Sequence, residues 1–306
     1  MTERLLTTAE LNRALLARQL LLDRVDLAIP AVLERVGGLQ AQYAPSMYVA
    51  LWSRLGRFER ADLETALSDR TVVQATLMRT TIHLVAAGDY WPFALAVREA
   101  RRAWWLRLQR GKQTADDLSA ASTALRAVLA EGPASYRDIK ALVGDELAGG
   151  VGLWLDLVRV PPSGTWARRR ADLYGAADGW VGPPPAADGG HLPYLVRSYL
   201  GGFGPATRDS VASWAGVPIR SVDAVLPTLE LRRFRTEDGA ELIDLPDAPL
   251  PPAETPAPVR FLPVWESCLL AHARRAGVLP ELHRAKVFEN RNPQSVNTFL
   301  IDGSVA

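Results

Sequence analysis

The chain of 306 residues is poor in cysteine, histidine and lysine, with one cysteine, four histidines and three lysines. One thiol cannot form an internal disulfide, and the cysteine and the histidines do not stand at the spacing of a zinc site. Long apolar runs are missing too, since no stretch approaches the roughly 18 apolar residues of a transmembrane helix. The sequence therefore predicts a cytoplasmic protein that holds no metal ion and does not enter a membrane.

Nucleotide and nucleophile motifs are also absent. The glycine-rich patterns G-x-G-x-x-G and G-x-x-x-x-G-K-[ST], which hold nucleotide phosphates, do not occur. No serine nucleophile motif is present, and no acidic residue closely precedes His83. We therefore expect no cofactor and no hydrolase triad. His83 falls between Ile82 and Leu84 of a predicted strand, where alternation places it opposite their apolar face, exposed or in a polar cleft, and a structural role is expected for it.

Net charge does not indicate a polyanionic partner, because 35 basic and 34 acidic residues leave only +1. The basic residues are unusual in kind, since three are lysines and 32 are arginines. A guanidinium binds phosphate through a fork of N–H donors, which a lysine ammonium lacks. Genomic base composition explains the same bias, so the positions of the arginines have to decide.

Helix signals and a strand pair follow one another in the first third of the chain. A capping box joins Thr7 and Glu10 ahead of apolar residues at helical spacing. A second apolar run over residues 29–36 ends at Gly37-Gly38, as helices often do. Residues 71–85 have the pattern of two strands in a hairpin. Helices followed by a two-stranded ribbon are typical of a winged helix.

An internal repeat extends this organisation. Gly132-Pro-Ala-Ser-Tyr-Arg-Asp138 matches Gly204-Pro-Ala-Thr-Arg-Asp209, and a predicted strand pair follows each, at residues 166–175 and 231–245. The expected fold class is α+β, mostly helical, with three tandem winged-helix units. The predicted boundaries are 1–110, 111–185, 186–250 and, for a β-rich C-terminal extension, 251–306. Residues 297–306 look like a strand, an Asp-Gly turn and only the start of a returning strand, so we expect a truncated end.

Two glutamines follow the double glycine in the segment Leu39-Gln40-Ala41-Gln42-Tyr43, just before Pro45. The segment is expected to be extended, because residues ahead of a proline disfavour helix. Side chains two apart on an extended chain point the same way, so Gln40 and Gln42 present two neutral amides together. Their donors and acceptors suffice to orient one water without removing its proton. Two polar residues in a solvated loop are the alternative.

At this point the sequence resembles the AlkZ/YcaQ-type DNA glycosylases, which are built from three tandem winged helices. The likeness covers nearly the whole chain, through Gly38-Leu-Gln-Ala-Gln42, Leu77-Met-Arg-Thr-Thr-Ile-His-Leu-Val85, Phe261-Leu-Pro-Val-Trp-Glu266 and Thr298-Phe-Leu-Ile-Asp-Gly303. It implies a concave DNA-binding surface and a catalytic Gln-apolar-Gln motif at Gln40 and Gln42, the AlkZ branch, rather than the branch with Asp in the second position. It also implies removal of bulky N7-alkylguanine adducts and interstrand crosslinks, in base excision repair or self-resistance to a DNA-alkylating antibiotic.

The chemistry of the residues is compatible with this implication. N7 alkylation puts a positive charge on guanine, so the base leaves without a general acid. The protein then has to place a water at C1′ and stabilise a cation-like sugar, which neutral amides can do. No lysine stands near Gln40 or Gln42 in the sequence to form a Schiff base, which predicts a monofunctional enzyme that leaves an abasic site; a lysine brought to the site by folding is the alternative. We expect recognition of a bulky lesion in place, because extruding it costs more than extruding a single base.

The expected DNA contacts are arginines on the predicted ribbons and on a long connecting helix, which is predicted from Trp91 to Leu108 between units one and two. A polar loop near the C-terminus is expected to contribute as well. The expected contact residues are Arg79, Arg101, Arg102, Arg168, Arg169, Arg170, Arg232, Arg233, Arg291, Asn292 and Gln294. The last three suit minor-groove edges, and relatives in the resembled family probe that groove with a hairpin in this region. Solvated faces and an exposed turn are the alternatives. Trp91, Trp104 and Trp105 are expected to pack in the core rather than stack on bases.

Two other functions use the same fold. A winged-helix transcription regulator binds DNA with the same ribbons and arginines but needs no paired amides, and a scaffold packs against a protein partner. Alanine at Gln40 and Gln42 separates the regulator from the enzyme, and the salt dependence of DNA binding separates the scaffold. Of the three we expect the glycosylase, a monomer that acts on alkylated purines in double-stranded DNA.

Overall fold

The computed structural model describes residues 4–185, 189–272, 277–288 and 295–306, and the structural statements below refer to these. The fold is α+β and largely helical, as the sequence predicts. The helices are α1 (Thr8–Arg18), α2 (Ile29–Val36), α3 (Ala44–Arg54), α4 (Arg60–Ser68), α5 (Ala87–Gln109), α6 (Ala115–Glu131), α7 (Tyr136–Ala148), α8 (Ala177–Val181), α9 (His191–Phe203), α10 (Arg208–Ala215), α11 (Ile219–Val225), α12 (Ser267–Leu270) and α13 (Glu281–Val287), with short 3-10 turns η1 (Met78–Thr80), η2 (Val151–Leu153) and η3 (Leu226–Thr228).

The strands form three sheets. One sheet has the order β2 (Leu39–Gln40), β4 (Ile82–Ala86), β3 (Val72–Thr76), β6 (Leu157–Arg159), β7 (Leu173–Ala176) and β5 (Ala134–Ser135). The second has β1 (Arg4–Leu6), β8 (Arg232–Thr236) and β9 (Glu241–Asp244), and the third has β10 (Arg260–Leu262), β11 (Thr298–Ile301) and β12 (Ser304–Val305). The predicted hairpin over residues 71–85 is confirmed as β3 and β4, which pair antiparallel from Val72 with Ala86 to Thr76 with Ile82.

Capping residues set the helix ends that the sequence predicts. Thr7 accepts the Glu10 N–H and the Glu10 side chain accepts the Thr7 N–H, so the predicted capping box is present at α1. Gly37 ends α2 in the left-handed region, and Gly38 follows with φ +81°. A Cβ at residue 38 would lie 2.9 Å from Val85 Cγ1, so glycine is required for β2 to approach β4.

The predicted strand pair over residues 166–175 is wrong in its first strand. The strands are β6 and β7, and residues 160–172 between them form a loop. Pro161 and Pro162 cannot donate ladder hydrogen bonds, which ends β6 early. The Ser163 hydroxyl then organises the loop, because it donates to Arg170 O and accepts from Asp172 N. The arginines at residues 168–170 therefore lie in a loop and not in a ribbon.

The sheets connect parts that the sequence assigns to different units. β3 of the first unit pairs with β6 of the second, so the two hairpins share one six-stranded sheet. β1, at the N-terminal end, pairs parallel with β8 of the third unit, because Leu6 is buried against Phe234 and Leu242. β8 and β9 form the third predicted hairpin, across residues 237–239.

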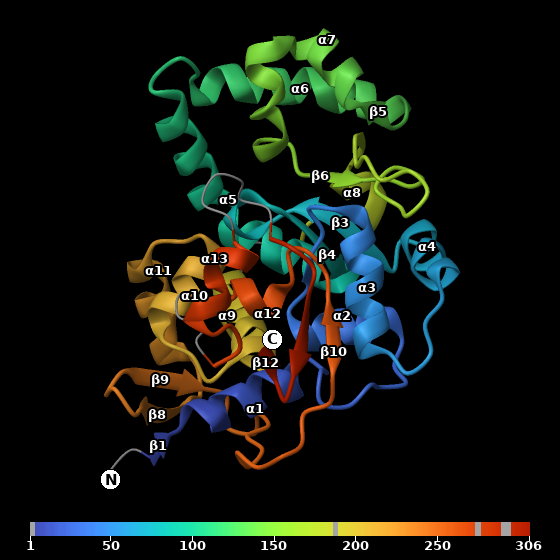
Figure 1. The fold of residues 1–306 in the computed structure, drawn as a ribbon. Coiled ribbons are helices and arrows are strands. Elements are labelled where there is room, and N and C mark those ends of the chain that lie inside the picture. Colours follow the sequence, from blue (N-terminus) through green and yellow to red (C-terminus); the bar gives the residue numbers. More distant parts are fainter. Residues whose placement is uncertain (1–3, 186–188, 273–276, 289–294) are drawn as a thin grey trace.

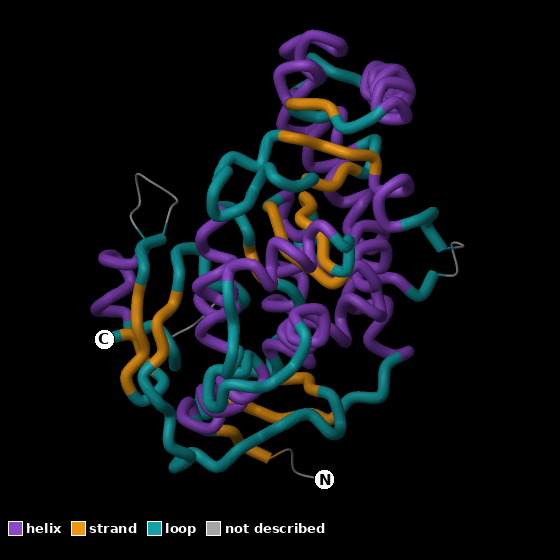
Figure 2. The backbone as a smooth tube through the Cα atoms, turned by 90° about the vertical axis from the view of Figure 1, so that its right-hand side faces the viewer, coloured by secondary structure: helices purple, strands orange, loops and turns teal. Residues whose placement is uncertain are grey.

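Two regions of unequal size are visible in Figure 1, where α6, α7 and β5 lie at the top and most other elements lie below. The 23-residue helix α5 connects them, at the position of the predicted connecting helix. The tube view in Figure 2 shows the same separation from the side. In the lower region α9 packs against α5, α2 and α1. Tyr199, Phe203 and Trp214 form an aromatic group in that core.

Candidate active site

The two glutamines lie at the edge strand of the six-stranded sheet. Gln40 ends β2 opposite His83 of β4, and Ala41 N–H donates to Ile82 O at 2.7 Å, so the backbone is extended as predicted. Gln40 is only 5% exposed, whereas Gln42 is exposed. The two amides therefore differ in access to solvent, which the sequence does not predict.

Hydrogen bonds determine how each amide is oriented. Arg79 Nη2 donates to Gln40 Oε1 at 3.0 Å, and the backbone N–H of Ile82 donates to Gln42 Oε1 at 2.9 Å. Because both donors require an acceptor, the amide oxygens face the segment 79–82. Neither Nε2 group is hydrogen-bonded to any described residue. Each amide thus retains its N–H donors and one carbonyl lone pair for other partners.

Arg79 lies in a turn with left-handed backbone, and contacts with α10 and the residue after it hold the turn in place. Arg79 and Thr80 have φ values of 52° and 57°, in the left-handed region. The guanidinium also donates to Trp214 O at 2.9 Å. Gly216 lies so close that a Cβ there would stand 2.9 Å from Arg79 N. The turn between β3 and β4 is thereby packed against the end of α10, and it brings Arg79, predicted as a DNA contact, to Gln40.

His83 is buried, with 2% exposure, so the expectation of an exposed or cleft position is wrong. β4 is an inner strand, between β2 and β3, and residues 83–86 are all buried, so both faces of the strand are covered. Burial, reinforced by the charge of Arg79, lowers the pKa of His83 to about 3. Its Nδ1 lies 3.0 Å from Thr81 O, which identifies Nδ1 as the protonated nitrogen of the neutral ring. His83 is therefore uncharged at neutral pH and supplies no proton there.

The buried imidazole predicts a pH-dependent loss of stability. Between pH 6.5 and about 3 the unfolded chain binds a proton on His83 that the folded chain does not bind. The free energy of unfolding should therefore fall as pH drops below 6.5, by up to about 5 kcal/mol near pH 3 from this group alone. Urea unfolding of wild type and His83→Asn at pH 7 and pH 4 measures the difference. Parallel losses in both proteins would contradict this assignment.

A buried ion pair positions the segment beneath Gln40. The Gln40 N–H donates to Ser267 Oγ at 3.2 Å. Ser267 follows Glu266, whose carboxylate accepts from Arg54 Nη2 at 2.7 Å, and both charged side chains are fully buried. Arg54 Nη2 also donates to Gln19 Oε1. No sequence pattern marks Arg54, Glu266 and Ser267 as site residues, although Glu266 is the last residue of one of the segments on which the family resemblance rests.

An arginine from the second hairpin lies beside the glutamine segment. Arg169 Nη1 donates to the Tyr43 hydroxyl at 3.0 Å, and its guanidinium lies over the rings of Tyr43 and Trp166. Arg168 and Arg170, by contrast, both face Asp172, at 3.6 and 3.3 Å. Within the described part of the chain Arg169 pairs with no carboxylate. Of these three predicted contacts, Arg169 has the most available charge.

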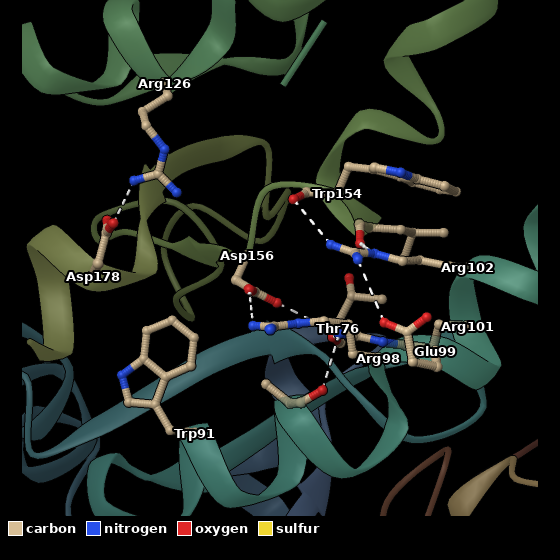
Figure 3. Close-up of polar contacts among 12 residues, drawn as sticks. Thr76, Trp91, Arg98, Glu99, Arg101, Arg102, Arg126, Trp154, Asp156 and Asp178 are labelled. Carbon is tan, nitrogen blue, oxygen red and sulfur yellow. Dashed lines mark hydrogen bonds and ion pairs between the residues drawn. The ribbon is translucent and has the colours of Figure 1, made fainter. Parts of the chain in front are cut away.

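Other predicted contacts are occupied by the protein itself. Arg101 is 5% exposed and binds Thr76 O and Asp156, and Arg102 donates to the carbonyl oxygens of residues 153 and 154, as Figure 3 shows. These contacts join α5 to Thr76 of β3 and to the segment that precedes β6, so the guanidinium groups of Arg101 and Arg102 are engaged by the protein itself. Arg232 likewise binds the buried Asp244 at 2.7 Å.

The remaining predicted contacts divide between open and undescribed positions. Arg233 is exposed and makes no ion pair with a described residue. Arg291, Asn292 and Gln294 lie outside the described residues.

The three tryptophans of α5 differ in burial. Trp91 and Trp105 pack inward, with indole N–H groups bound to Gly182 O and Gln113 Oε1. Trp104 is 42% exposed, which corrects the expectation that it packs in the core.

The described residues contain neither a cluster suited to a metal ion nor a helix suited to cross a membrane. No group of three or more His, Cys, Asp or Glu side chains there has the arrangement of a metal site. None of the helices there has the length and apolar character to cross a membrane.

Comparison with known proteins gives one family and one shared fold. No curated protein matches the sequence. The solved structure of Streptomyces sahachiroi DNA glycosylase AlkZ matches with a TM-score of 0.80 at 19% identity, over 98% of this chain and 87% of that chain, which shows a common fold. The family model described as DNA glycosylase AlkZ-like matches residues 33–306, which include both glutamines and Arg79. The protein therefore belongs to the AlkZ-like family of DNA glycosylases.

Proposed function

We propose that this protein is a monofunctional DNA glycosylase that hydrolyses the N-glycosidic bond of bulky N7-alkylguanine adducts, including interstrand crosslinks. It acts as a monomer on double-stranded DNA in the cytoplasm and leaves an abasic site. The observation that carries the proposal is the pair of amides on Gln40 and Gln42, both oriented by the segment 79–82, in a chain of the AlkZ-like family.

The two amides have different tasks in this mechanism. The Arg79 cation draws electron density from Gln40 Oε1, whereas Gln42 Oε1 accepts only from a neutral backbone N–H among the described residues. Gln42 is also the exposed one of the pair. Gln42 Oε1 is therefore the better acceptor for a proton of the attacking water, and Gln40 contributes N–H donors that hold the water or the sugar. The departing base, already cationic, needs no acid.

The lysines support a monofunctional reaction. A bifunctional glycosylase needs an amine at C1′, and the hydrogen bonds that the described residues make to the side chains of Gln40 and Gln42 come from Arg79 and Ile82, not from a lysine. Lys140 pairs with Asp145 on α7, and Lys286 is exposed on α13. Attack by water instead of an amine leaves an intact strand with an abasic site.

A base-release assay tests the proposal. A duplex with a single N7-alkylguanine is incubated with the protein, and free base is quantified by chromatography. We expect release of the alkylated base, strand cleavage only after alkali, and no covalent product with borohydride. Absence of base release would refute the glycosylase, and a borohydride-trapped complex would refute the monofunctional mechanism. Survival of bacteria that express the protein, challenged with a DNA-alkylating antibiotic, tests self-resistance.

Arg169 provides a separate test of DNA binding near the site. Replacing Arg169 with alanine should weaken binding to every duplex sequence and lower the slope of log K against log salt by about 1, because one phosphate contact is lost. Fluorescence anisotropy at several salt concentrations measures this slope. Arg168→Ala is the matched control, since Arg168 faces Asp172. An equal effect of both variants would show that Arg169 has no special role.

A further inference from the structure

A cavity that is lined by Arg79, but not by Gln40 or Gln42, has no part in the proposed hydrolysis. It has a volume of about 670 Å³ and lies between α5, the η1 turn and the connection from α10 to α11. This volume is in the range of small-molecule binding sites. The cavity is much larger than the single water molecule that the reaction consumes, so that water does not account for it.

Arg79 connects the cavity to Gln40. The residue lines the cavity, and its Nη2 donates to Gln40 Oε1. Arg79 thus belongs both to the cavity wall and to the hydrogen bonds of the amide pair. A group attached to the base can reach the cavity while the sugar remains beside Gln40 and Gln42.

The walls of the cavity favour a flat and aromatic group. On α5, Ala96, Ala100 and Ala103 contribute small side chains that leave the space open. Trp104, next on the same helix, lines the cavity with an indole that is 42% exposed. Indole rings stack on planar groups, and the contact is stronger than burial of the area alone.

The polar groups of the walls favour oxygen acceptors on that aromatic group. Arg107 and Arg220 line the cavity and are exposed, and neither pairs with a carboxylate of the described chain. Glu99, the acidic wall residue, already lies 3.5 Å from Arg102. The cationic donors at the wall that pair with no described carboxylate therefore include the guanidinium groups of Arg107 and Arg220. A phosphate group can bind arginines such as Arg107 and Arg220 on an open surface. Binding of a phosphate therefore requires neither the indole of Trp104 nor a cavity of this size.

We propose that this cavity receives the aromatic substituent that a bulky lesion carries on guanine N7, stacked on Trp104 and facing Arg107 and Arg220. This inference rests on the proposed glycosylase function and extends it to the part of the lesion outside the base. The cavity then selects for bulky aromatic lesions, because a small N7 substituent gains nothing from its walls.

Two duplexes of one sequence test the proposal, one with N7-methylguanine and one with N7-(2-naphthylmethyl)guanine. The measured quantity is the ratio of single-turnover release rates, naphthylmethyl over methyl. Trp104→Ala removes the stacking surface and Ala103→Phe fills the cavity, so each should lower this ratio about tenfold, the value of one lost stacking contact. Leu108→Phe is the control, since Leu108 is 56% exposed on the same helix and is not a wall residue. It should leave the ratio unchanged.

The outcomes separate this inference from the proposed function. Release of neither base by the wild-type protein would refute the glycosylase itself. Release of both bases with an unchanged ratio in both cavity variants would overturn the cavity assignment alone, since the cavity would then hold the DNA backbone or the base. Circular dichroism melting curves verify that each variant is folded, and the second variant keeps the test valid if one is not.

Discussion

Replacing Gln42 with alanine is expected to slow release of N7-alkylguanine by about 100-fold to 1000-fold, the cost of one positioned group that acts on the reacting atoms. The physical reason is that Gln42 is exposed and its oxygen keeps a lone pair for the water, while its orientation is maintained by the Ile82 N–H. Gln40→Ala should act in the same direction with a smaller effect, because that amide is 5% exposed and its oxygen is bound by Arg79.

The measurement is single-turnover base release together with affinity for undamaged duplex. We expect the rate to fall while the affinity stays unchanged, since neutral amides contribute little to counterion release. Gln109→Ala, at the end of α5, is a matched control for the loss of a glutamine. A transcription regulator would show no base release in any variant. A Gln42→Ala protein with the wild-type rate would refute the assigned role.

Replacing Glu266 with alanine is expected to lower the free energy of unfolding by about 3–5 kcal/mol, because the Arg54 charge would remain buried without its partner. Both side chains have no exposed surface, and Arg54 Nη2 lies 2.7 Å from the Glu266 carboxylate. The same substitution should reduce base release, since Glu266 precedes Ser267, which accepts the backbone N–H of Gln40.

A double variant distinguishes an uncompensated charge from lost packing. Arg54→Met combined with Glu266→Leu removes both charges, and it should recover a large part of the stability that the single variant loses. Recovery should be incomplete, because Gln19 Oε1 loses its bond from Arg54. Urea unfolding of the wild type, the single variant and the double variant, fitted with one common m value, measures the three free energies of unfolding. If Glu266→Ala lowers the free energy of unfolding by less than about 1 kcal/mol, the ion pair contributes no more than a surface ion pair does, and the prediction is wrong.

Local signals in the sequence predicted many helix ends and turns correctly. The capping box at Thr7, the double glycine after α2 and the Asp-Gly turn at residues 302–303 are all present, because each depends on residues close in the chain. The first strand of the second hairpin was misplaced, since Pro161 and Pro162 end it and no periodicity marks that break. The arginines at residues 168–170 were consequently assigned to the wrong kind of element.

Clusters of charge in the sequence did not show which charges are available. Arg101 and Arg169 both belong to clusters of arginines in the sequence. In the structure Arg101 binds Thr76 and Asp156, whereas the guanidinium of Arg169 lies over the ring of Tyr43. Burial and pairing depend on residues far apart in the chain, such as Asp156 for Arg101. Trp104 and Trp105 are adjacent, but among the described residues only the indole N–H of Trp105 has a hydrogen-bond partner, Gln113 Oε1. Neighbouring positions on one helix face different surroundings.

By itself the sequence determined the α+β class, the order of helices and hairpins, and an extended segment that carries Gln40 and Gln42. These features depend on periodicity, capping and glycine, which act within a few residues. Only the tertiary structure decided that Arg79 and Ile82 orient the two amides, that His83 is buried and uncharged, and that Ser267 and Glu266 lie beneath Gln40. Those contacts join residues up to 227 positions apart, and chain folding alone brings them together.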